Sequence, residues 1–597
     1  MKIGFAFGEH IKTEKLKKRR YSEGGRNLRT RSFLLPVLLF IAGSLLLTKL
    51  FYLQIVKGST YVALSDSNRI RTLVIHAPRG VILDREGAPI VQNMPGFRQI
   101  EKCHDKKCTV ILTQDQALPL IAKGDKNIEV DSLRSYPFKD QMSHILGYTG
   151  QVSKEELDSV EFKDYPGTDW VGKSGIEREY EHILRGNDGK ELVEVDASGK
   201  KIRSLGITDP IPGQDLALTI DSSLQKAAFD ATNEMKRGAV IVGKPDGEIL
   251  ALVSRPSYDP NLFTLDKNYK VASESAYQKV SDVLIGENQP LLNRVIGGTY
   301  PPGSTFKIVT AASGLQTNII DENYKIVDTG IINIGEFSFA NWYYTEFGRK
   351  EQGELNVVRA LARSNDIFFY KLAEKVSVDR LSAIAVKMGL GAKTGIDLGG
   401  EQAGLVPTKK WKADTLKENW YLGDTYHYGI GQGYLLTTPL QVNEWTSIIA
   451  SGGDLNEPHL LKSKEQTAKS KEILSKKTIN LIRQGMIESC STGGVAWPLF
   501  DFKVNNPKLK IDGKNIMEVK EASSSAKAQD LRKVAVACKT GTAQHGGEET
   551  KPHAWITLFA PAYNPEIVVT VLKEESGEGS NEAAPIAKKI LEKYFSR

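Results

Sequence analysis

The chain has 597 residues, of which 40% are hydrophobic and 25% are charged, and its formal net charge is +7. This composition is typical of folded globular proteins and excludes a largely disordered or collagen-like chain. The length is too great for a single hydrophobic core, so we expect at least two folded units.

The basic charge is concentrated at the N-terminus, where residues 1–31 hold ten Lys and Arg against three Glu. The strongly apolar run 33–56 follows, with Lys49 as its only charged residue. A helix of this length rises about 36 Å, enough to cross a bilayer core of about 30 Å. Basic residues before a span favour a cytoplasmic N-terminus, and no small-residue cleavage site follows the run. We therefore predict a cytoplasmic basic tail (1–31), an uncleaved transmembrane anchor (32–56) in the cell membrane, an extracytoplasmic remainder and no nucleic-acid partner.

Short alternating strands and frequent turn residues characterise residues 57–212. This pattern predicts a β-rich domain, here called the pedestal. Its Arg79, Asp84 and Arg85 are expected to form structural ion pairs, because nothing around them has a catalytic pattern. A polar stretch at 209–214 marks the boundary with the next domain.

The four cysteines are too few for a disulfide framework in a chain of this size. Cys103 and Cys108 are close enough to pair across a tight loop, and the sequence leaves that pairing open. Cys490 and Cys538 are expected to be small buried residues. No Cys/His spacing resembles a structural zinc site, so no metal is predicted.

Residues 213–597 are predicted to form one α+β domain, because apolar strands lie near both ends of this stretch and helices dominate its middle. We therefore expect a central sheet that takes strands from both ends. The polar residues 502–530 are expected to be a long surface insertion. The expected elements are strands at 216–220, 238–242, 249–253, 554–559 and 567–572, and helices at 222–235 (N-capped by Asp221) and 583–595.

The first of three short motifs is Ser304-Thr305-Phe306-Lys307, which follows a rigid Pro-Pro-Gly turn and begins a helical pattern. Residues three apart share one helix face, so the hydroxyl of Ser304 and the amine of Lys307 are neighbours. A serine becomes a nucleophile when a base takes its proton, and a lysine with a lowered pKa is such a base. The motif predicts a nucleophile, Ser304, and a base, Lys307.

The second motif, Ser364-Asn365-Asp366, lies between a helical pattern at 357–363 and an apolar helical run. Ser364 is a candidate proton relay to a leaving group, and Asp366 is a candidate to hold Lys307 or a substrate amide. A helix cap is an equally ordinary use of these residue types, and the sequence leaves it open.

The third motif, Lys539-Thr540-Gly541-Thr542, follows a buried strand at 534–538. Lys539 and the two threonine hydroxyls suit a substrate carboxylate, and Gly541 leaves room for substrate against the strand edge. The N–H groups of Thr542 and Ser304 are candidates for an oxyanion hole.

The three motifs, in this order, resemble those of penicillin-binding proteins and serine β-lactamases. The resemblance to class B, or monofunctional, penicillin-binding proteins covers nearly the whole chain, and no upstream run resembles a glycosyltransferase module. Within class B, the strings 394–398 and 423–425 resemble penicillin-binding protein 2, of the elongation branch, and Asp366 in place of the commoner Asn fits that branch better than the septal one. The further matching strings are Arg79-Gly80 with Asp84-Arg85, Gly175-Ile176-Glu177, Leu184-Arg185-Gly186, 218–221 with Leu224-Gln225, 394–398, 423–425, 429–433 and 438–441.

This resemblance implies a single membrane anchor, a pedestal or dimerisation-type domain and a transpeptidase domain with a central antiparallel sheet flanked by helices. It implies a D,D-transpeptidase in which Ser304, Lys307, Ser364 and Lys539 are catalytic. The implied partners are D-Ala-D-Ala stem peptides, lipid-linked precursors, β-lactams and a cell-wall polymerase of the elongation complex. No cofactor is implied. Some elongation members bind zinc just before the second motif, but residues 328–363 contain neither Cys nor His, so zinc is not expected.

Two other interpretations remain open. A D,D-carboxypeptidase or β-lactam-hydrolysing enzyme would use the same residues with water as the acceptor. A membrane-anchored scaffold, whose pedestal activates a polymerase, would not need the catalytic residues.

Overall fold

The computed structural model describes residues 31–597, apart from residues 104–105, 126, 164, 197–199, 266–268, 272–274, 463–467, 471, 521–529 and 548. The described chain separates into two compact units. The first comprises the N-terminal region to Leu73 together with Glu191–Ile207, and the second comprises Val74–Lys190 and Thr208–Arg597.

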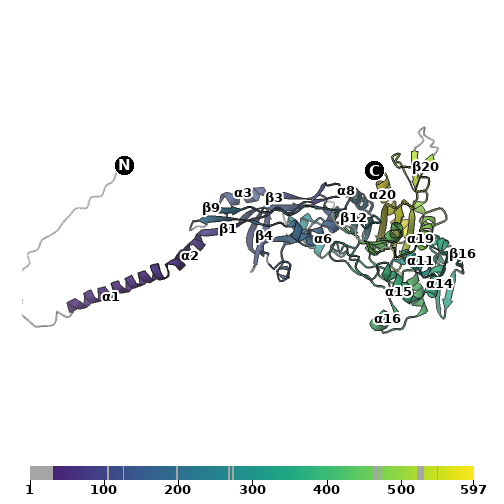
Figure 1. Cartoon of the computed structure of the whole chain (residues 1–597), viewed down its shortest axis with the longest axis horizontal. Helices are drawn as coiled ribbons and strands as arrows, with labels where there is room; N and C mark the ends of the chain where they lie inside the picture. Colours follow the sequence, from purple (N-terminus) through teal and green to yellow (C-terminus); the bar gives the residue numbers. More distant parts are fainter. Residues whose placement is uncertain are drawn as a thin grey trace, which may run out of the picture. The chain divides into compact units, whose positions relative to one another are not determined.

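The first unit contains the predicted anchor. Within the described residues, Leu34–Val56 is the one helical stretch long and apolar enough to cross a membrane, with a mean hydropathy of 2.2. Its leucines are largely exposed, as lipid-facing side chains should be. The elements of this unit are α1 (Arg31–Phe51), a π-helical turn (Tyr52–Val56), α2 (Gly58–Arg69) and most of a three-stranded sheet in the order β1 (Ile70–Ile75), β8 (Gly189–Val195) and β9 (Lys201–Thr208) (Figure 1).

The pedestal part of the second unit is built on the long strand β3, which pairs with three antiparallel neighbours. Strand β10, which follows the polar stretch at 209–214, pairs in parallel with β2 and therefore extends this sheet rather than the next one. The elements are β2 (Ile82–Leu83), β3 (Pro89–Cys103), β4 (Lys106–Leu112), α3 (Gln114–Ala122), β5 (Ile128–Ser135), α4 (Ser143–Leu146), β6 (Thr149–Gln151), α5 (Lys154–Leu157), β7 (Trp170–Gly172), α6 (Gly175–Glu179), α7 (Glu181–Leu184) and β10 (Leu216–Ala217).

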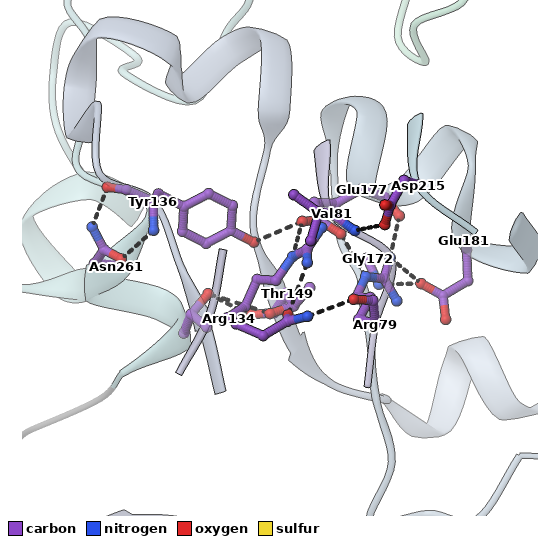
Figure 2. Close-up of polar contacts among 12 residues, drawn as sticks. Arg79, Val81, Arg134, Tyr136, Thr149, Gly172, Glu177, Glu181, Asp215 and Asn261 are labelled. Atoms are coloured by element: carbon purple, nitrogen blue, oxygen red, sulfur yellow. Dashed lines mark hydrogen bonds and ion pairs between the residues drawn. The ribbon is translucent and has the colours of Figure 1, made fainter. Parts of the chain in front are cut away.

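A buried cluster of charged residues joins the pedestal strands to helices α6 and α7 (Figure 2). Arg79 contacts Glu177 at 2.6 Å and Glu181 at 2.7 Å, and Arg134 contacts the other oxygen of Glu177 at 2.6 Å. Glu177 is fully buried. Arg79 is thus paired as the sequence predicted.

The same cluster reaches the next part of the chain through Tyr136 and Asn261 (Figure 2). The Tyr136 hydroxyl contacts Glu177 at 3.4 Å. The backbone of Tyr136 donates to, and accepts from, the amide side chain of Asn261 in α9 (Asn261–Thr264). The pedestal and the C-terminal part of the second unit are therefore joined by buried hydrogen bonds.

The C-terminal part contains a five-stranded antiparallel sheet in the order β12–β11–β24–β23–β22. It takes strands from both ends of this part, as predicted. Four predicted strands are confirmed within one or two residues, and β22 carries the third motif. The strands are β11 (Gly238–Gly243), β12 (Ile249–Arg255), β22 (Ala537–Ala543), β23 (His553–Ala560) and β24 (Ile567–Lys573).

Helices cover both faces of this sheet, because alternate strand residues point to opposite sides. Val240 and Val242 pack with α8 (Ser222–Ala231) and α20 (Ala584–Phe595). Ala239 and Ile241 share the other core with α11 (Lys307–Gln316), α18 (Pro439–Ser451) and α19 (Lys476–Ser489). Asp221 caps α8 through a 2.9 Å contact with Leu224 N, as predicted. The remaining helices here are α10 (Val280–Leu284), α12 (Trp342–Glu346), α13 (Val357–Arg363), α14 (Asp366–Val376), α15 (Val378–Lys387), α16 (Lys409–Leu416) and α17 (Leu422–Gly429).

Several expectations differ from the structure. The strand expected at 534–538 is broken at 535–536, and the helix expected at 222–235 ends at Ala231. Cys490 and Cys538 are buried, as predicted. They are also bonded to each other, with their Cα atoms 5.8 Å apart, a pairing that the sequence did not predict. Cys108 is disulfide-bonded, whereas the side chain of Cys103 lies outside the described residues.

The predicted insertion at 502–530 is not simply a surface loop, because much of its described part is ordered as strands. β19 (Lys503–Val504), β21 (Asp530–Val534) and β20 (Ile516–Lys520) form a small antiparallel sheet. Phe502 and Val504 are buried. The chain then leaves this sheet at Val534 and enters the central sheet at Ala537.

Candidate active site

Ser304 lies in a one-turn 3₁₀ segment, Gly303–Phe306, which leads directly into α11. Ser304 is half-buried, whereas Lys307, at the start of α11, is fully buried. Thr305 stabilises the turn by donating its hydroxyl to Pro302 O at 2.8 Å. In a 3₁₀ turn, residues three apart are eclipsed, so the backbone places Ser304 and Lys307 on one face.

Ser364 links the two lysines of the first and third motifs. It follows α13 with φ 52° and ψ 37°, a left-handed conformation. Lys307 Nζ contacts the Ser364 carbonyl at 2.7 Å and its hydroxyl at 3.4 Å, and Lys539 Nζ donates to the same hydroxyl at 2.8 Å. An oxygen that accepts from both sides keeps its own O–H free to donate to a third group.

Asp366 is the counter-ion of this pair of lysines. Its Oδ1 contacts Lys307 Nζ at 2.6 Å. Burial lowers the pKa of Lys307, and the charge of Asp366 only partly opposes that effect. Burial, reinforced by the charge of Lys307, lowers the pKa of Lys539 well below its ordinary value. Two buried amines share one carboxylate, so the site favours a state in which one amine is neutral.

The third motif approaches the serine segment through two glycines. A Cβ added at Gly303 would lie 2.8 Å from Thr542 O, and one added at Gly541 would lie 3.0 Å from the Thr305 side chain. Gly541 therefore allows strand β22 to pack against the turn that carries Ser304. This close approach places Thr542 beside Gly303, the residue before Ser304, and an oxyanion hole formed by the N–H groups of Ser304 and Thr542 stays a prediction.

The structure thus brings together residues from all three predicted motifs. A continuous series of contacts runs from Asp366 through Lys307 and Ser364 to Lys539. Thr540 accepts a 2.9 Å hydrogen bond from Lys539 through its carbonyl. The side chains of Thr540 and Thr542 differ in exposure: Thr540 is buried, and Thr542 is exposed. Their role in substrate binding stays a prediction.

Sequence reasoning missed the groups that hold the second motif in place. Asn365 caps α14 by accepting from Phe368 N at 2.7 Å. Trp342 N donates to Asp366 Oδ2 at 2.8 Å, and Asn341 Oδ1 accepts from Asp366 N at 3.1 Å. The Asn-Trp pair at 341–342 has no motif character, and no local signal in the sequence would have found it.

The segment before the second motif does not fit a zinc ion. The polar groups of this segment that lie together are the carboxylate of Asp328, the side-chain amide of Asn341 and Gln352. The Asn341 amide donates to Asp328 and to the Gln352 side chain, and the backbone N–H of Gln352 donates to Asp328. Zinc in proteins is held by Cys, His and carboxylate ligands, and residues 328–363 offer no Cys or His.

Comparisons with known proteins agree with this geometry. Residues 238–592 match the family model described as the penicillin binding protein transpeptidase domain, and residues 125–218 match the penicillin-binding protein dimerisation domain. The peptidoglycan D,D-transpeptidase MrdA of Haemophilus influenzae is 31% identical, over 96% of this chain and 92% of the relative. That of Escherichia coli K12 is 32% identical over 92% of each.

The fold is also similar to solved structures. The complex between penicillin-binding protein PBP2 and MreC from Helicobacter pylori contains a chain with a TM-score of 0.71 and 28% identity, covering 88% of this chain and 99% of that one. With both domain models matched and a relative above 30% identity over nearly its whole length, this chain belongs to the class B penicillin-binding protein family.

Proposed function

We propose that this chain is a membrane-anchored peptidoglycan D,D-transpeptidase that works through an acyl-enzyme on Ser304. The observation that supports it best is the Ser364 hydroxyl, which is hydrogen-bonded to both Lys539 and Lys307 beside Asp366. This arrangement offers a base for the nucleophile and a separate proton donor for the leaving group.

In the acylation step, the neutral amine of Lys307 takes the proton of Ser304 as its oxygen attacks the carbonyl between the two terminal D-alanines of a stem peptide. The N–H groups of Ser304 and Thr542 stabilise the oxyanion. The C–N bond then breaks, and Ser364 donates its proton to the leaving D-alanine amine. Lys307, which took the proton of Ser304, returns a proton to Ser364, whose hydroxyl lies 3.4 Å from its Nζ. Lys539, Thr540 and Thr542 hold the substrate carboxylate.

In the second step, the amine of a neighbouring stem peptide attacks the ester carbonyl. Its proton is taken by the same relay, the ester C–O bond breaks, and Ser304 recovers its hydroxyl proton. A β-lactam would acylate Ser304 by the same attack, with its ring C–N bond breaking. Water in place of the amine would give a carboxypeptidase or a β-lactam-hydrolysing enzyme.

The remaining proposals concern location and partners. The apolar helix at Leu34–Val56 supports a single anchor, and the basic residues before it support a cytoplasmic N-terminus. The relatives named MrdA and the MreC-bound neighbour support a role in cell elongation and a cell-wall partner. We place the pedestal at residues 57–212 and the transpeptidase domain at 213–597. We assign the pedestal as the surface that binds a polymerase partner of the elongation complex. That polymerase would use lipid-linked precursors to make the strands that this chain cross-links.

Labelling with a fluorescent penicillin tests the assignment of Ser304. The wild-type protein should be labelled covalently, and Ser304→Ala should lose all labelling while keeping its melting temperature. The exposed Thr345→Ala change is a control for handling and should label normally. Labelling that survives in Ser304→Ala would overturn the assignment. Products formed from a D-Ala-D-Ala stem peptide with and without an amine acceptor would then separate transfer from hydrolysis.

A further inference from the structure

Asp366 is held by two groups from a segment that lies 24 and 25 residues upstream in the sequence, one at its carboxylate and one at its backbone N–H. Asn341 Oδ1 accepts from Asp366 N at 3.1 Å, and Trp342 N donates to Asp366 Oδ2 at 2.8 Å. Asn341 is completely buried, and Asp366 is 7% exposed. Residues 341–342 therefore hold both the backbone and the side chain of Asp366, which leaves Oδ1 for Lys307.

Asp328 determines which way the amide of Asn341 faces. Its Oδ2 accepts from Asn341 Nδ2 at 2.9 Å and from Gln352 N at 2.8 Å, and its Oδ1 accepts from Gly330 N at 2.8 Å. A carboxylate only accepts hydrogen bonds, so the Nδ2 of Asn341 must face Asp328. The Oδ1 of Asn341 is then the atom presented to Asp366. Asp328 is 1% exposed, so water does not compete for these contacts.

We propose that Asp328 and Asn341 are positioning residues that fix the carboxylate of Asp366 against Lys307 and so control how Lys307 exchanges its proton with Ser304. This inference rests on the proposed function, because it assigns a role to Lys307 as a base. Neither residue is assigned a contact with substrate. Both act through the hydrogen bonds that run from Asp328 to Asn341 and from Asn341 to Asp366.

The charged surroundings of Lys307 give the direction of the effect. Asp366 faces it from α14, and Lys539 faces it from β22. Glu346 in α12 and Tyr370 in α14 lie within electrostatic range of Asp366. Burial lowers the pKa of Lys307 and Asp366 raises it. If Asp366 loses its fixed position, the pKa of Lys307 should fall further.

The test is the rate constant for acylation of the full-length protein by a fluorescent penicillin, measured from pH 5 to 10. Asn341→Ala should slow acylation about 10- to 100-fold, as expected for a displaced catalytic group. The acidic limb of the pH profile should move to lower pH, because the neutral amine of Lys307 persists further into acid. Asp328→Asn, which keeps the side-chain shape, should change both quantities in the same direction by a smaller amount.

The double variant D328N/N341D provides a rescue, because it exchanges an amide and a carboxylate without changing the net charge. It should recover part of the rate lost in N341D alone, where two carboxylates would face each other. Asn333→Ala is the matched control and should match wild type: Asn333 is exposed and lies in the hairpin of β14 (Ile331–Ile334) and β15 (Phe337–Ala340), which ends directly before Asn341. Melting temperatures of all variants separate folding from catalysis.

The outcomes separate a failure of this inference from a failure of the proposed function on which it rests. If wild type is not labelled, or is labelled equally in Ser304→Ala, the proposed function fails. If labelling depends on Ser304 but folded Asn341→Ala and Asp328→Asn keep the wild-type rate and pH profile, the positioning role fails and the two residues are only structural. If the exchanged pair recovers nothing over N341D, the link between Asp328 and Asn341 is refuted.

Discussion

The pedestal and the candidate active site each bury a cluster of charges, and the two clusters are balanced differently. In the pedestal, Arg79 and Arg134 meet two carboxylates, Glu177 and Glu181 (Figure 2). Burial alone would oppose the charge on Glu177, but the two arginines outweigh it, and its pKa is lowered. Likewise, the pKa of Arg79 is raised despite its burial. Both shifts favour the charged forms of Arg79 and Glu177, so we assign this cluster a structural role.

The active-site cluster contains two lysines, Lys307 and Lys539, and one carboxylate, Asp366. Its cations also differ in kind from those of the pedestal, since an arginine does not release its proton within a protein whereas a buried lysine does. Burial exceeds the attraction of the single carboxylate, and the pKa of both lysines falls. Balanced buried charges hold a fold together, and an unbalanced set can move a proton.

The largest expected effect comes from a matched exchange of cations. Lys307→Arg keeps the charge beside Asp366 but removes a base, so acylation by a fluorescent penicillin should fall about 10²- to 10⁴-fold. Arg79→Lys makes the opposite exchange in the pedestal and should leave the acylation rate of the folded protein unchanged. Near-wild-type acylation by Lys307→Arg would show that the comparison is mistaken.

Removing the pedestal's shared carboxylate should reduce stability rather than activity. Glu177→Ala leaves Arg79 and Arg134 buried without their common partner, which should cost about 3–5 kcal/mol of unfolding free energy. Chemical denaturation followed by circular dichroism measures this loss. Asp230→Ala, which removes an exposed ion pair with Lys226, is the control and should cost less than about 1 kcal/mol. A comparable loss in both variants would mean that burial is not the cause.

A smaller, pH-dependent effect should come from His144, which connects the two parts of the second unit through a 2.8 Å contact with Pro290 O. Burial lowers its pKa from 6.5 to about 4. As pH falls from 6.5 to 4, the unfolded chain binds a proton that the folded one refuses, so the free energy of unfolding should fall by up to about 3 kcal/mol. Below pH 4 this contribution should level off.

Stability curves of His144→Phe measure that effect, because phenylalanine keeps an aromatic ring against Tyr258 and cannot titrate. The slope of stability against pH between 4 and 6.5 should decrease relative to wild type. The exposed His182→Phe change should leave the slope as it is. An unchanged slope in His144→Phe would assign the acid sensitivity to other groups.

The sequence predicted those features that local patterns encode. The helix expected at 357–363 appears with those bounds, and the strands that alternate or run apolar were found because their periodicity is visible within five or six residues. The motifs identified Lys307, Ser364 and Lys539, which the fold then brings into contact. Contacts between residues that are far apart in the sequence have no such local pattern.

Asn341 illustrates what could not be predicted, because its partners Asp328 and Asp366 lie 13 and 25 residues away and depend on how a hairpin packs on α14. The Cys490–Cys538 bond is another example, with 48 residues between its members. Four cysteines permit several pairings, and only the packing of α19 beside β22 selects this one.

That disulfide has a consequence for where the site is completed. Cys538 directly precedes Lys539, so the bond anchors the strand that presents this lysine to the end of α19. Thiols pair in oxidising compartments and stay reduced in the cytosol. With the exported topology proposed above, the covalent bond beside Lys539 would close only after the C-terminal part has crossed the membrane. The oxidising compartment would then contribute to completing the site.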